Sequence, residues 1–273
     1  MKRVAGLTVF GGVVGVVAVV GYLNADRLFP AEITDLPQTV EIPAGDFDFR
    51  MTGQFRIGNH IVDAPLEKIK SAPAFLVMKY HVSQAEYDLC VADGVCDKTV
   101  VKPDKNLPQA AISFYDARAY AEWFSKKTKR KWRLPSALEW QRYAGDQFVD
   151  LSFGDLDDKD NPAKRWLAEY AQQTALRTEP DLNLRPIGAK GVNNFGVADI
   201  ASNIWEWTDT CYYNVALDKD GQTVLERFEN CAVRAVEGKH TAFIIEFVRD
   251  ANVGGCAVGV PPDFLGFRLV LES

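Results

Sequence analysis

One stretch of ten residues, Asp199–Thr208, constrains the fold of this chain more than any other. It places two carboxylates seven positions apart around a predicted tight turn, and two tryptophans flank the second carboxylate. Ca²⁺ in proteins takes oxygen ligands from carboxylates and from backbone carbonyls. The stretch therefore predicts a structural Ca²⁺ site, and the alternative is that its carboxylates cap turns and pair with arginine side chains. The expected ligands are the carboxylates and carbonyls of Asp199, Ser202, Ile204 and Glu206.

The N-terminus predicts a membrane anchor. Residues 4–23 are apolar, and about 20 such residues are needed to cross a bilayer. Lys2 and Arg3 precede this run, which favours a cytoplasmic N-terminus of residues 1–3. Residues 24–40 read as a polar linker containing prolines, and residues 41–273 as one domain on the far side of a bacterial inner membrane, in the periplasm. A cleaved signal peptide is the alternative, although residues 23–25 are a poor cleavage site.

The charge balance argues against a nucleic-acid partner. The chain has 31 Lys and Arg against 37 Asp and Glu, a formal net charge of −6. The sequence contains no dense block of basic residues that could bind along a phosphate backbone. Nucleic acid is therefore not an expected partner, and the inner membrane is one through the N-terminal helix.

Export to an oxidising compartment makes disulfides the default for the five cysteines. Cys90 and Cys96 bracket a glycine turn, which predicts a local bridge. Cys211 with Cys231 is the preferred second pair because it closes an insertion with a strong turn sequence, Asp218-Lys-Asp-Gly. A pairing that involves Cys256 stays open, and a free Cys256 would be an exposed nucleophile.

Local patterns predict few regular elements. Alternating side chains over residues 40–49 indicate a strand, and serine caps followed by an acidic residue predict three helices. These helices cover residues 83–93, 113–127 and 136–143, and a further helix is expected over 163–173. The rest of the chain lacks sustained periodicity, which predicts a loop-rich α+β fold.

Six strings, in order along the chain, carry a specific resemblance. They are Ile42-Pro-Ala-Gly45, His81–Tyr87, Pro108–Trp123, Arg133–Ala144, Asn203-Ile-Trp-Glu-Trp-Thr208 and Pro262–Arg268. In this order they resemble the motifs of the formylglycine-generating enzyme, or sulfatase-modifying-factor, family, which also includes ergothioneine sulfoxide synthases and a pyoverdine-maturation branch. The resemblance implies an irregular α+β domain similar to an elaborated C-type-lectin-like fold, a single domain behind the N-terminal transmembrane helix.

The chemistry of that family is not expected here. Formylglycine-generating enzymes bind Cu(I) through a pair of cysteines on a strand that corresponds to residues 233–249, since soft thiolates stabilise the reduced metal. Aligned on Arg234, the two positions fall near His240 and Ile245, so no copper is expected. The histidines at 60, 81 and 240 lack the spacing of a shared metal site. Weak catalytic candidates on or after this strand are His240, Glu246, Arg249, Asp250 and Cys256.

Three functions fit these observations. The preferred one, which the resemblance to accessory members of the family implies, is a membrane-anchored periplasmic accessory or maturation protein that holds a periplasmic or membrane protein partner, for example a nitrite reductase or another metalloenzyme. The second is an oxidoreductase that acts on a peptide or a peptide-derived metabolite. The third is a Ca²⁺-dependent lectin-like binding module. Whether the chain is an enzyme is left undecided by the sequence, and Arg133 and Arg268 are expected to be structural guanidinium groups.

Overall fold

The computed structural model describes residues 33, 35–99, 104–150, 152, 162–176, 183–251 and 264–272. The predicted anchor 4–23, much of the linker and Cys256 lie outside these residues. By contacts, residues Pro37–Ser273 form one unit and Met1–Leu36 another. Within the described ranges, no helix has both the length and the apolar character needed to span a bilayer. The fold described below is that of Pro37–Ser273.

A four-stranded sheet closes one side of the domain. Its strands, in spatial order, are β1 (Thr39–Ile42), β6 (Phe75–Met78), β12 (Val270–Leu271) and β7 (Trp132–Arg133). The sequence predicts a single strand over residues 40–49, and this prediction is wrong in one respect. The strand is interrupted at Pro43, because proline has no backbone N–H to donate. The chain resumes as β2 (Gly45–Arg50), which pairs with β5 (Leu66–Ala72) in a separate two-stranded sheet.

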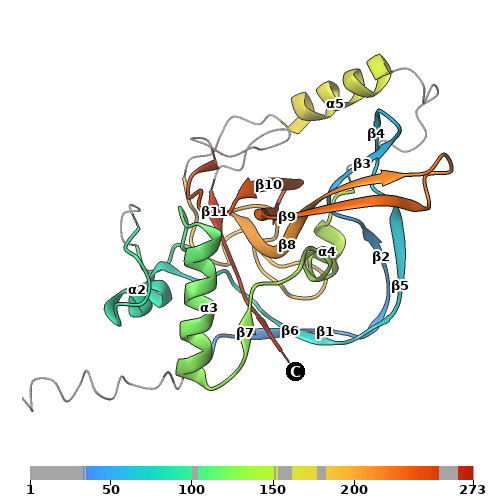
Figure 1. Cartoon of the computed structure of the whole chain (residues 1–273). Helices are drawn as coiled ribbons and strands as arrows, with labels where there is room; N and C mark the ends of the chain where they lie inside the picture. The colour runs from blue at the N-terminus through green and yellow to red at the C-terminus, as the bar shows by residue number, and fades with distance from the viewer. Residues whose placement is uncertain are drawn as a thin grey trace, which may run out of the picture. The chain divides into compact units, whose positions relative to one another are not determined.

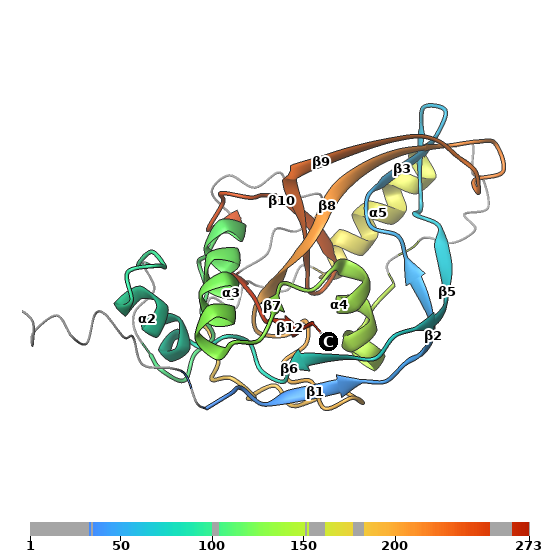
Figure 2. The same cartoon turned by 60° about the horizontal axis from the view of Figure 1, so that its bottom comes forward.

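The largest sheet contains the long β8–β9 hairpin, which extends away from the rest of the domain in Figures 1 and 2. Its spatial order is β10 (Thr241–Ile245), β9 (Val224–Glu237), β8 (Trp205–Leu217), β3 (Gln54–Ile57) and β4 (His60–Val62). Short β11 (Leu265–Gly266) lies parallel to the start of β8. The predicted turn closes the hairpin, since Gly221 donates to the carbonyl of Asp218 at φ +71°.

Three helices begin with the same device, as the sequence predicts. They are α2 (Gln84–Ala92), α3 (Phe114–Thr128) and α4 (Ala137–Ala144). In each, a serine accepts from the backbone N–H three residues on, and an acidic side chain there accepts from the backbone N–H of the serine. A 3₁₀ turn, η1 (Gly145–Gln147), follows α4, and α5 covers Pro162–Leu176, slightly beyond the predicted 163–173.

Helix α4 connects the two larger sheets. Its Trp140 and Tyr143 pack in one buried cluster with residues of β1, β6 and β12, and α4 also contacts β8 and β9. Helix α3 contributes a second apolar layer, in which Tyr120 stacks on Tyr87 of α2 and meets Phe267 edge to face. The predicted α+β class is confirmed, and the start of β8 lies in the middle of this packing.

Candidate functional site: a buried ionic network and a cationic cavity

Asp199 begins the turn that the sequence singles out, and its carboxylate is bound by backbone donors. One oxygen accepts from the N–H of Gly188 at 2.5 Å and the other from the N–H of Lys190 at 2.8 Å. Asp199 itself has φ +59°, a conformation that Asp tolerates better than most residues. The side chain is 1% exposed, so it ties the preceding loop to the turn from the inside.

Glu206, on β8, is fully buried and meets four polar groups. Its oxygens lie 2.7 and 2.9 Å from two guanidinium nitrogens of Arg268. The Tyr143 hydroxyl donates to it at 2.8 Å, and His81 Nε2 lies 3.0 Å away. Burial alone would raise the pKa of Glu206, but the charge of Arg268 and the contact with His81 outweigh burial and hold it well below its usual range.

Arg268 is held by carbonyl oxygens as well as by Glu206. It donates to the carbonyls of Lys79 at 3.0 Å and Ala198 at 2.9 Å. These contacts of a fully buried side chain confirm the expectation that Arg268 is structural. Burial and the neighbouring guanidinium of Arg268 lower the pKa of His81, which favours the neutral form of the imidazole. Arg133 likewise pairs with Glu139 at 2.7 Å and Glu272 at 3.2 Å.

These contacts do not fit a Ca²⁺ ligand set that includes Glu206. A carboxylate offers about four acceptor positions, and protein groups surround all of them here. A metal would have to displace the buried guanidinium of Arg268, which already neutralises the carboxylate. The calcium site remains a prediction, and metal analysis of the purified protein tests it.

The backbone of the same turn borders a small cavity with cationic walls. Its volume is about 50 Å³, and the turn residues Ser202 and Ile204, both predicted ligands, line it. Among the described residues that line it, the charged ones are Arg185, Lys190 and Lys239, and none is acidic. Cationic side chains in a lining attract an anion more readily than a divalent cation.

The catalytic candidates on and after β10 lie mainly in ion pairs. Glu246 accepts from Arg234 at 2.8 Å and from the Tyr115 hydroxyl at 2.6 Å. Arg249 forms a two-nitrogen contact with Asp116, at 2.7 and 2.8 Å. These partners account for the charge of both side chains without a substrate.

His240 and Asp250 are the other described candidates on this segment. The His240 ring meets Trp205 edge to face at 4.6 Å between centroids, and its Nδ1 lies 3.0 Å from the Thr241 carbonyl oxygen. Asp250 has a partner as well. Cys256 lies outside the described residues, so the structure does not bring the five candidates together.

Sequence reasoning missed Glu237, which lies directly opposite Glu206 in the β8–β9 ladder. It is 1% exposed, and burial raises its pKa to about 8, with a further increase from the charge of Glu206. Thr241 donates to one oxygen at 2.8 Å and opposes the shift. Within the described residues, the other oxygen has no hydrogen-bond partner. Only the register of β8 against β9 places Glu237 opposite Glu206, and a single sequence does not reveal that register.

Both predicted disulfides, Cys90–Cys96 and Cys211–Cys231, are confirmed. Four of the five cysteines are therefore bonded, which leaves Cys256 alone. With both bridges closed, one chain cannot supply the two thiolates of a Cu(I) site. Among the described residues, the one cluster of three metal-ligating side chains contains Cys211 and Cys231, whose sulfurs are bonded to each other.

The histidines do not share a site in the described structure. His60 is exposed on β4, whereas His81 is buried beside Glu206. His240 is half-buried beside Trp205. The expectation that the three stand in separate segments is consistent with these positions, and the loss of any shared metal stays a prediction.

Curated proteins with similar sequence are formylglycine-generating enzymes. The enzyme of Mycobacterium tuberculosis is 31% identical over 111 residues, which is 39% of this chain and 34% of that protein. The enzyme of Streptomyces coelicolor is 30% identical over 106 residues, which is 37% of this chain and 32% of that protein. The matches span about a third of the length of these relatives.

Comparison of structures and of family sequence patterns agrees on the fold. PvdO from Pseudomonas aeruginosa superposes with a TM-score of 0.54 at 20% identity, covering 89% of this chain and 97% of that one. Residues 24–273 match the family described as the sulfatase-modifying factor enzyme 1-like domain, a range that includes every described element. The chain belongs to this family.

Proposed function

We propose that this chain is an accessory or maturation protein that uses the formylglycine-generating-enzyme fold to hold a partner protein or peptide. The observation that carries the proposal is the cationic cavity beside the turn at Ser202–Trp205. Three cationic side chains from two segments of the chain line it, at residues 185 and 190 of one loop and at residue 239. A carboxylate or another acidic group of a partner is the ligand chemistry that matches this lining.

The state of the cysteines supports a role without formylglycine chemistry. The family's copper site needs two thiolates, and the two closed disulfides leave only Cys256. Glu246 and Arg249, which occupy the corresponding segment, are neutralised by partners within the protein. Glu246 and Arg249 therefore fit a structural role in ion pairs better than a role in catalysis.

We also propose that the protein works in the periplasm, attached to the inner membrane through residues 4–23. Two disulfides support an oxidising compartment, because cytosolic thiols are kept reduced. Fractionation of cells with the full-length protein, followed by protease treatment of spheroplasts, tests this arrangement. Protection of the domain from protease in spheroplasts with an intact inner membrane would contradict it.

Calorimetry with short peptides tests the binding role. We expect the full-length protein to bind a polyglutamate peptide and to bind a polyglutamine peptide of the same length weakly or not at all. The double variant Lys190→Gln/Lys239→Gln should weaken binding about tenfold or more, since two cationic groups are lost. Lys219→Gln, at the exposed hairpin turn, is the control and should bind like the unaltered chain.

Two results would contradict the proposal. Equal binding of both peptides would show that charge does not direct recognition. Oxygen uptake in the presence of copper and a cysteine-containing sulfatase peptide would show that formylglycine chemistry persists. We expect that uptake to stay at background.

A further inference from the structure

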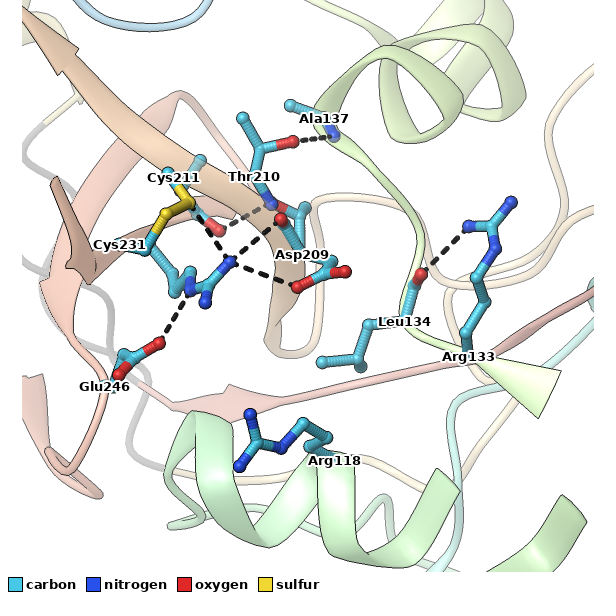
Figure 3. A network of polar contacts seen from close by, with 12 residues as sticks. Arg118, Arg133, Leu134, Ala137, Asp209, Thr210, Cys211, Cys231 and Glu246 are labelled. Carbon is cyan, nitrogen blue, oxygen red and sulfur yellow. Dashed lines mark hydrogen bonds and ion pairs between the residues drawn. A yellow bond between two sulfur atoms is a disulfide. The ribbon is translucent and has the colours of Figure 1, made fainter. Parts of the chain in front are cut away.

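We propose that the Cys211–Cys231 disulfide is a thiol–disulfide exchange site as well as a crosslink, and that it reacts with an external thiolate. The guanidinium of Arg234 lies beside this bridge, with its Nη1 3.3 Å from Cys211 Sγ. Figure 3 shows the bridge between Cys211 and Cys231, with Asp209 and Glu246 near it. An arginine keeps its positive charge at every pH at which a protein is folded. A permanent cation in contact with one sulfur makes the two ends of the bridge chemically different.

Arg234 is fixed in this position by several contacts. Its Nε donates to Glu246 at 2.8 Å, and its Nη1 donates to both the backbone carbonyl and the side chain of Asp209 at 3.1 Å. The guanidinium carbon also lies 4.3 Å from the centroid of the Phe114 ring. The cation is therefore already oriented towards Cys211 before any reaction takes place.

The two cysteine residues also differ in exposure. Cys211 is 6% exposed, whereas Cys231 lies in an exposed stretch of β9. Strand β10 pairs with β9 only at residues 233–237. The N–H of Glu246 also donates to the carbonyl of Ala232 at 3.0 Å, and within the described ranges no strand pairs with this edge of β9 before Ala232. A reacting thiol can therefore approach Cys231 from the part of the edge that precedes Ala232.

The reaction that fits this asymmetry begins with attack by an external thiolate on Cys231 Sγ. A new sulfur–sulfur bond forms between them, the Cys211–Cys231 bond breaks, and its electron pair leaves with Cys211 as a thiolate beside Arg234. A neighbouring cation lowers the pKa of a thiol, and a leaving thiol of lower pKa departs faster. A second external thiolate then attacks the external sulfur of the mixed disulfide. This releases Cys231 as a thiolate, which takes up a proton from solvent, and yields an oxidised external disulfide, so the protein gains the two electrons that the two external thiolates lose.

Acidic groups also face the bridge. A carboxylate oxygen of Glu229 lies within 4.8 Å of both sulfurs. The Tyr213 hydroxyl donates a hydrogen bond to Glu229 Oε1 at 2.7 Å. Glu246 and Asp209 offset part of the charge of Arg234. Glu229 is exposed, whereas the Arg234 side chain is only 12% exposed, so solvent screens the charge of the carboxylate more than that of the guanidinium. Attraction to the guanidinium therefore outweighs the repulsion at Cys211.

The second disulfide of the same chain is a matched control. Cys90 and Cys96 are both buried, at 0% and 7% exposed, at the end of α2. The full-length protein is equilibrated with graded ratios of reduced to oxidised glutathione, quenched with an alkylating agent and analysed by peptide mass spectrometry. We expect Cys211–Cys231 to open at a ratio about tenfold or more below that for Cys90–Cys96. Simultaneous opening, or earlier opening of Cys90–Cys96, would overturn the proposal.

Substitution of the cation tests its role directly. The pH dependence of alkylation of Cys211 is measured in reduced protein. Arg234→Gln should move the midpoint upward by about one pH unit, and Arg234→Lys should largely restore it, because the charge returns. Arg118→Gln, a nearby arginine that pairs with Glu122, is the control for a general change in charge. An unchanged midpoint in Arg234→Gln would remove Arg234 from the site.

Trapping distinguishes the source of the thiol. Cys211→Ser leaves Cys231 without its partner, and this variant should form a stable mixed disulfide. Incubation with oxidised glutathione in one arm and with the disulfide form of a small dithiol protein in the other shows which partner reacts faster, since the Cys231 thiolate attacks that disulfide and one of its sulfurs leaves as a thiolate. Modification of Cys231 in neither arm, in protein with an unchanged circular dichroism spectrum, would contradict the proposed access.

Discussion

At the scale of residues, the centre of this domain is an ion pair without solvent. Glu206 and Arg268 are both 0% exposed and are joined by two hydrogen bonds. Desolvation makes such a pair costly, and the attraction repays it only when further hydrogen bonds satisfy the remaining atoms. Tyr143, His81 and the carbonyls of Lys79 and Ala198 supply them. The pair therefore depends on three further segments being in place, at residues 79–81, 143 and 198.

Removing the guanidinium should be severely destabilising. Arg268→Met leaves Glu206 charged and buried, which typically costs about 3–5 kcal/mol. Urea unfolding, followed by tryptophan fluorescence, measures this change. The double variant Arg268→Met/Glu206→Gln should recover a large part of the loss, because no uncompensated charge remains. Equal stability of the single and double variants would show that packing, and not charge, sets the role of Arg268.

Sequence could identify these residues but not their partners. The two carboxylates at residues 199 and 206 led to the prediction of a calcium site, because the type and spacing of ligands can be read from a short stretch of sequence. Their donors come from far along the chain, with Arg268 separated from Glu206 by 62 positions and His81 by 125. Such pairing depends on how β11 and β6 meet β8, and a single sequence does not contain that information. The alternative raised from the sequence, that these carboxylates cap turns and pair with arginine, matches the observed contacts.

At the scale of elements, the helices were predictable because their signals are local. A serine and an acidic residue three positions later mark the starts of α2, α3 and α4, and each capping box is present. Short strands were not predictable in the same way. Strands such as β7, β11 and β12 contain two residues each, and they are defined by their partners rather than by a repeating pattern.

The α3 cap offers a test at this scale. Ser113→Ala removes an acceptor for the Asp116 N–H at 3.2 Å, and we expect a loss of about 1 kcal/mol, with a lower melting temperature. Ser113→Asp retains a capping oxygen and is the control for the loss of the hydroxyl. Because Asp116 also holds Arg249, a much larger loss would indicate that the cap supports that ion pair as well. An unchanged melting temperature in Ser113→Ala would contradict the role of the cap.

At the scale of the whole molecule, two neighbouring carboxyl groups give opposite dependences of stability on pH. The pKa of Glu206 is lowered by Arg268 and His81 against the effect of burial, so its contribution is present above its unfolded pKa, near 4.5, and is lost as pH falls below that value. Burial raises the pKa of Glu237 to about 8. Its folded state keeps a proton that the unfolded chain releases, so this group destabilises the fold progressively between about pH 4.5 and pH 8.

Glu237→Gln isolates the second effect, since the amide has a similar shape and does not ionise. Near pH 4 the variant and the unaltered chain should unfold at similar urea concentrations. As pH rises towards 8, the unaltered chain should lose on the order of 3–5 kcal/mol relative to the variant, from about 1.4 kcal/mol for each unit of pKa shift. Urea unfolding at several pH values measures this difference. A difference that does not change with pH would show that Glu237 has the same protonation state in the folded and unfolded chains, and that its burial opposite Glu206 is compensated by other groups.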